Sequence, residues 1–96
     1  MDADRLAGLV RRHAALTDEL SAALRSRGDI RAVVTRTYAE TWRANFQMAI
    51  TERRESCRVS TVDLDVETAK LDGEIEALRA ELTHIELAVA VGRAVL

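Results

Sequence analysis

The sequence predicts an all-α protein, and composition gives the first two observations for this fold class. The chain of 96 residues contains no proline, four glycines and three aromatic residues. Ala, Leu, Arg and Glu are abundant, and these residues lose little rotamer freedom in a helix. No hairpin dipeptide separates two alternating apolar runs, so no pair of strands is expected.

The third observation is a seven-residue repeat that runs through residues 61–96. No charged residue falls on its core positions, and a repeat over about five heptads is typical of a helix packed lengthwise against other helices. We refer to these core positions as the seam. The a positions are Thr61, Thr68, Ile75, Leu82, Val89 and Leu96, and the d positions are Leu64, Leu71, Leu78, Ile85 and Gly92.

The first helix is expected over about residues 4–27, where apolar residues recur in steps of three and four. Gly28 can adopt the left-handed conformation that ends a helix, and Asp29 is a favourable N-cap for the next one. So short a connection favours antiparallel neighbours, which predicts a long helical hairpin.

A second helix is expected over about residues 30–57 and a third over about residues 61–95. Ser60 and Asp63 have the spacing of a capping sequence, which favours a new helix at this point. No glycine or proline forces a break there, however. The alternative is one continuous rod of roughly 65 residues, near 100 Å long at 1.5 Å per residue.

Residues 1–96 are expected to form a single helical domain, because the chain is too short for two. A chain of this length buries a modest core. We therefore expect a long helical hairpin or a three-helix coiled-coil-like bundle that is completed by oligomerisation. The expected oligomer interface consists of Leu64, Leu71, Ile75, Leu78, Leu82, Ile85 and Val89.

Charge is unevenly distributed although the net charge is only −2. Residues 1–60 carry an excess of positive charge and residues 61–96 an excess of negative charge, which can select helix partners. A single cysteine, Cys57, cannot form an internal disulfide and suits a reducing compartment. No signal-peptide core or membrane-spanning run is present, so a cytoplasmic protein without a membrane partner is expected.

Tyr38, Trp42 and Phe46 are spaced by four residues and share one side of the expected second helix. Such aromatic residues commonly pack in a core, and the alternative is a surface that stacks bases or binds a partner. Further along, Arg53, Arg54 and Arg58 form a small basic cluster diluted by two glutamates. They are expected to be solvated, and the alternative is contact with nucleic acid.

Two histidines are the remaining candidates. His13 lies in the apolar stripe of the first helix, which predicts a buried neutral histidine that donates to a neighbour. Its alternatives are a metal ligand or a pH-sensitive core position. Glu81 and His84 form one E-x-x-H pair, the weak metal candidate of the chain. Di-iron bundles need two such pairs, so ordinary surface residues are expected here.

The sequence contains no catalytic motif, and no enzyme activity, cofactor or bound metal is expected. We expect a structural or adaptor protein that self-assembles through coiled-coil helices and presents a surface to another protein. One alternative is a small nucleic-acid-binding or regulatory protein that uses the arginines of the first two helices. A further alternative is a metal-binding helical bundle.

Overall fold

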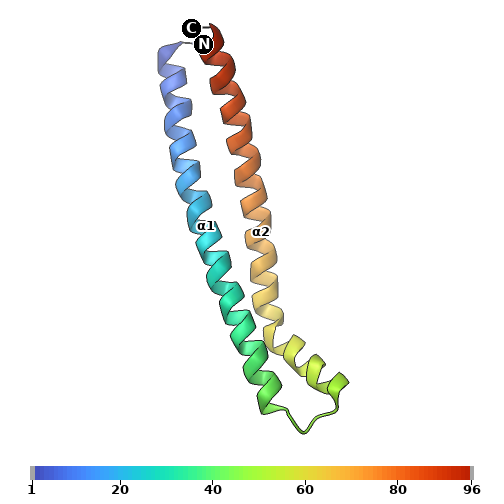
Figure 1. The fold of residues 1–96 in the computed structure, drawn as a ribbon. Helices are drawn as coiled ribbons and strands as arrows, with labels where there is room; N and C mark the ends of the chain where they lie inside the picture. Colours follow the sequence, from blue (N-terminus) through green and yellow to red (C-terminus); the bar gives the residue numbers. More distant parts are fainter. Residues whose placement is uncertain (1, 96) are drawn as a thin grey trace. The chain divides into compact units, whose positions relative to one another are not determined.

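The computed structural model describes residues 2–95, and it confirms the all-α prediction. Helix α1 spans Ala3–Ala44 and helix α2 spans Ile50–Val95, and the two long helices pack as a hairpin (Figure 1). The seam position Leu96 lies outside the described residues.

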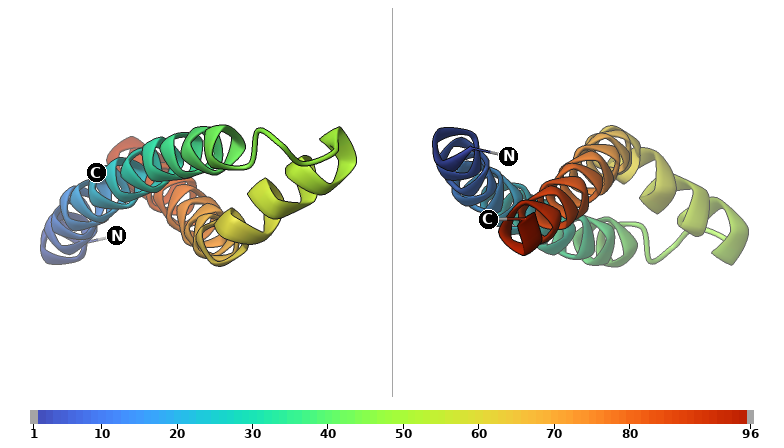
Figure 2. Two further views of the ribbon diagram at one scale, coloured as in Figure 1. Left: turned by 90° about the horizontal axis from the view of Figure 1, so that it is seen from below. Right: turned by 90° about the horizontal axis from the view of Figure 1, so that it is seen from above.

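The hairpin divides into two compact units, each containing a part of both helices. The terminal unit consists of Met1–Leu24 and Gly73–Leu96, and the connecting unit consists of Arg25–Asp72. Within the terminal unit, the start of α1 runs beside the end of α2 (Figure 1). Within the connecting unit, the first turns of α2 diverge from the end of α1 (Figures 1 and 2).

Apolar side chains of the seam hold the terminal unit together. Leu16 of α1 is completely buried, and it forms a cluster with Leu82 and Ile85 of α2. Four partly buried residues pack against this cluster: Leu9, Leu20, Leu78 and Val89. The heptad register predicted for α2 is therefore the register that faces α1 in this unit.

The predicted helix break at Gly28 and Asp29 is wrong, because α1 continues through both residues to Ala44. Gly28 has no positive φ, so it keeps the right-handed helical conformation. A glycine inside a helix costs only about 1 kcal/mol relative to alanine, which packing on either side can offset. Here Arg27 donates to Asp72 of α2 at 2.9 Å and Ile30 is half-buried, so the helix gains contacts by continuing.

The connection lies at residues 45–49, inside the stretch predicted as the second helix. The last four carbonyl groups of a helix have no partner within the helix. Two side chains donate to carbonyls at the end of α1. Asn45 Nδ2 donates to the Thr41 carbonyl at 2.8 Å, which also accepts from the backbone N–H of Asn45 at 3.1 Å, and Arg53 Nε donates to the Trp42 carbonyl at 2.6 Å. These bonds explain why the helix ends here.

The predicted break before Ser60 is also wrong, and the alternative of a continuous helix is confirmed at this point. Ser60 and Thr61 do not cap a new helix. Their hydroxyl groups donate back to the Cys57 carbonyl, at 2.7 Å and 3.3 Å. Such bonds to the preceding turn are compatible with the interior of a helix. The two helices of the hairpin thus replace the three that were expected.

We expect Gly28→Ala to raise the free energy of unfolding by about 1 kcal/mol, because an added Cβ would meet nothing within 4 Å and alanine favours the helix. Urea unfolding followed by circular dichroism measures the change. Ala32→Gly, one turn along on an exposed position, should lower stability by a similar amount. A destabilised Gly28→Ala protein would mean that residue 28 is not helical.

We expect Leu16→Ala to lower the free energy of unfolding by about 2–5 kcal/mol, because it leaves a cavity among Leu82 and Ile85. Val66→Ala on the exposed side of α2 should change stability by less than about 0.5 kcal/mol. The same urea experiment compares the two variants. Equal effects would show that Leu16 is not a core residue.

Candidate functional site

The predicted oligomer interface is turned toward α1 within the chain. Ile75, Leu82 and Ile85 are buried in the terminal unit, and Leu78 and Val89 are partly buried there. In the connecting unit, Leu64 and Leu71 are half-buried. An assembly that used these side chains would have to displace α1. Their role between copies therefore stays a prediction.

A second row of residues, small or apolar except for one histidine, lies on the opposite side of α2 in the terminal unit. All of them are exposed, and they follow one another in steps of four, three, four, three and four residues. Leu87 and Val91 are 63% and 66% exposed, so they contact little of their own chain. We name this set the outer face. It consists of Gly73, Ala77, Ala80, His84, Leu87 and Val91.

The outer face was missed by the sequence analysis although its spacing is visible in the sequence. The seam has larger and more uniform side chains, and its repeat alone was sufficient to predict a packed helix in this stretch. The missed signal is a second repeat of three and four residues in the same helix, displaced from the first. This second, exposed repeat makes the outer face a candidate contact surface.

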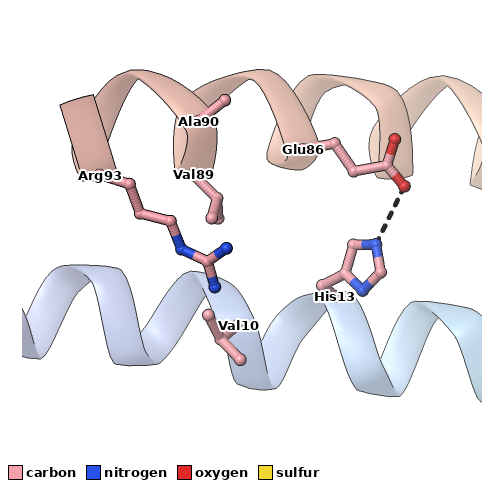
Figure 3. Close-up of a pocket in the computed structure, with 6 residues that line it drawn as sticks. All are labelled: Val10, His13, Glu86, Val89, Ala90 and Arg93. Atoms are coloured by element: carbon pink, nitrogen blue, oxygen red, sulfur yellow. Dashed lines mark hydrogen bonds and ion pairs between the residues drawn. The ribbon is translucent and has the colours of Figure 1, made fainter.

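An open pocket of about 300 Å³ lies between α1 and α2 in the terminal unit (Figure 3). Val10, Val89 and Ala90 supply its apolar lining. Polar side chains border it: His13 Nε2 lies 3.0 Å from Glu86 Oε1, and Arg93 extends from α2 toward α1 (Figure 3). The pocket could hold a small apolar group beside a charged one.

The prediction that His13 is buried is wrong, because 39% of its side chain is exposed. The residue lies at the edge of the Leu16 cluster, where its imidazole reaches both solvent and Glu86. The predicted contact with a neighbour does occur. A polar contact this exposed contributes at most about 1 kcal/mol.

The two weak metal candidates do not meet in a cluster of ligands. Glu81 accepts hydrogen bonds from Arg12, whose Nη2 lies 3.1 Å from Oε1, and His84 is exposed on the outer face. Among residues 2–95, no group of three or more His, Cys, Asp or Glu side chains is placed to hold a metal ion. The structure thus assigns Glu81 a partner on α1.

The three aromatic residues differ in their surroundings within the connecting unit. Trp42 is half-buried under Arg53, whose guanidinium carbon lies 3.8 Å from the ring centroid. Tyr38 is 39% exposed, and Phe46 is 68% exposed in the connection after α1. Core packing is therefore at best partial for Trp42 and is wrong for Phe46. The helix ends before Phe46, which removes that residue from the face shared by the other two.

The three arginines of the predicted basic cluster are engaged differently. Arg53 contacts Trp42, while Arg58 donates to Glu55 from Nε at 2.9 Å. Arg54 is exposed and borders an open hollow that Tyr38, Trp42 and Arg43 also line. Local partners thus occupy two of the three positive charges.

The hydrogen bond from Arg58 lowers the pKa of the Glu55 carboxyl group, and the charge of Arg58 adds to this effect. The same bond raises the pKa of Arg58. The folded-state pKa of Glu55 is lowered, so the ionised carboxylate stabilises the helix at pH values above the usual carboxyl pKa. This stabilisation is lost as the pH falls through the folded-state pKa and the carboxylate is protonated. Both side chains are more than half exposed, at 63% and 58%, so solvent screens this i,i+3 pair.

Neither α1 nor α2, over the described residues, has a stretch long and apolar enough to cross a membrane. Comparison of the chain with protein-family models, with curated proteins and with solved structures gives no match. The functional interpretation therefore depends on the chemistry and exposure of the residues described above.

We expect Arg53→Ala to increase acrylamide quenching of the fluorescence of Trp42, the single tryptophan of the chain, and to lower stability by about 1 kcal/mol. The variant removes the guanidinium from the ring and the donor from the Trp42 carbonyl. Arg54→Ala is the matched control, since its side chain makes neither contact. Unchanged quenching in Arg53→Ala would contradict the observed packing.

Proposed function

We propose that the protein is a non-enzymatic structural or adaptor protein that self-associates through its helices and presents a surface to another protein. One observation carries this proposal. The chain exposes 6772 Å² of accessible surface at a mass of 10.6 kDa. A compact monomer of that mass exposes about 5,500 Å². The excess of about 1,300 Å² exceeds the roughly 800 Å² that one partner contributes to a standard interface.

The distribution of apolar side chains supports the same proposal. Few side chains are buried in the hairpin, and small hydrophobic cores of this kind supply only a few kcal/mol of stability. Many large apolar side chains are exposed instead. They include Val10, Val59, Val62, Val66, Leu87 and Val91 along the helices. Covering part of this surface with a second copy would remove it from water and stabilise the fold.

The adaptor role draws support from the end of the hairpin in the connecting unit. Phe46, Met48 and Ile50 are exposed in or beside the connection, at 68%, 42% and 61%. Connections are usually polar, and exposed apolar groups beside tryptophan and tyrosine are typical of protein-binding surfaces. We propose this surface, together with Tyr38 and Trp42, as the contact for another protein.

The second candidate function is nucleic-acid binding, and one observation favours it. Tyr38, Trp42, Arg43 and Arg54 border the same hollow in the connecting unit. Proteins that bind single strands combine aromatic rings with positive charge in this way. Affinity for an oligonucleotide that falls steeply with added salt would support this candidate over the first.

We expect the purified chain to have the mass of a dimer or a larger species by light scattering after size exclusion, at both low and high salt. Apolar contacts mediate the proposed association, so added salt should not dissociate the oligomer. A series of protein concentrations serves as the control for non-specific aggregation. A monomer at every concentration, or assembly only at low salt, would contradict the proposal.

A further inference from the structure

We propose that the outer face of α2 packs against the same face of a second copy, with the two α2 helices antiparallel. This inference depends on the proposed self-association and specifies the surface that mediates it. Its position follows from the terminal unit, where the seam already packs against α1 and the outer face is exposed. A twofold axis would make both copies use the same residues, as in most dimers.

The sizes of the side chains on the outer face favour the antiparallel arrangement. The first half holds Gly73, Ala77 and Ala80, and the second half holds His84, Leu87 and Val91. Antiparallel pairing about residue 82 places each large side chain of one copy opposite a small residue of the other. Val91 then meets Gly73, Leu87 meets Ala77, and His84 meets Ala80. Parallel pairing would set large against large and leave a gap between the small residues.

The charges beside the outer face favour the same direction. Glu74 and Glu76 flank its small half, whereas Ala88 and Ala90 flank its large half. Antiparallel helices place these glutamates against alanines of the second copy, and parallel helices would place them against each other. Near the axis, the carboxylate of Glu81 is compensated by Arg12 of its own chain at 3.1 Å.

The backbone at Gly73 has room for this contact. A Cβ added there would meet nothing within 4 Å, so the space beside it is free for a side chain of the second copy. The contact extends over residues 73–91, which is about 28 Å of helix. Residues without bulky side chains allow two helices to approach closely along such a length.

The test compares charge substitutions on α2 by light scattering and sedimentation. The double variant Leu87→Glu with Val91→Glu should weaken association about 100-fold or more, because it buries charges without partners. Its helix content should stay that of the wild type, since both residues are exposed within the chain. The double variant Val62→Glu with Val66→Glu, at positions of α2 that are 41% and 50% exposed in the connecting unit, is the matched control and should keep the wild-type mass.

Cysteine pairs test the direction of the helices. The variant with both Gly73→Cys and Val91→Cys should form a covalent dimer on mild oxidation, because these positions face each other between copies. Each single substitution should form little. The native Cys57 is buried and does not interfere.

The outcomes separate this inference from the proposed function. A wild-type monomer would overturn both. A wild-type oligomer whose mass survives the double glutamate substitution would overturn only the outer-face contact. Rapid linkage of Val91→Cys alone would indicate parallel helices and overturn the antiparallel arrangement.

Discussion

The packing of Leu16 against Leu82 and Ile85 is the interaction on which the terminal unit depends. Two helices can bury only one stripe of side chains each, because every other face of both remains in water. This constraint explains why few residues are buried although much of the chain is apolar. A helix whose seam is occupied by α1 can contact a further helix only with its opposite side.

The connecting unit is stabilised by different means. Its buried residues are Cys57 and Thr61, which are small and partly polar, rather than leucine and isoleucine. Hydrogen bonds from Asn45 and Arg53 close the end of α1, and Arg53 also covers the ring of Trp42. The large apolar side chains that do not find a place in this core are exposed around the connection. The polar contacts at the end of α1 thus leave these apolar side chains exposed around the connection.

Folding and the proposed assembly require the same kind of side chain in this protein. The sequence contains one strong seam, and its periodicity predicts a role in oligomerisation. In the structure the seam packs against α1 and so stabilises the hairpin. Because α1 belongs to the same chain, this packing needs no second copy. The surface that remains for the proposed association is the outer face, which has smaller side chains than the seam. Its small residues allow close contact between helices.

The sequence by itself determined the fold class and, in the terminal unit, the seam register of α2, because helical periodicity is a local property. It placed the turn of the hairpin at Gly28, whereas the chain turns at residues 45–49. It did not determine where the helices end. Gly28 and Ser60 carry the local signals of a break, yet neither ends a helix. The helix ends near Asn45, where Arg53 reaches a free carbonyl from across the connection. Only the tertiary structure decided this, because the partner lies on another helix. The tertiary structure likewise decided which face of α2 stays exposed, because this depends on which face of α2 packs against α1.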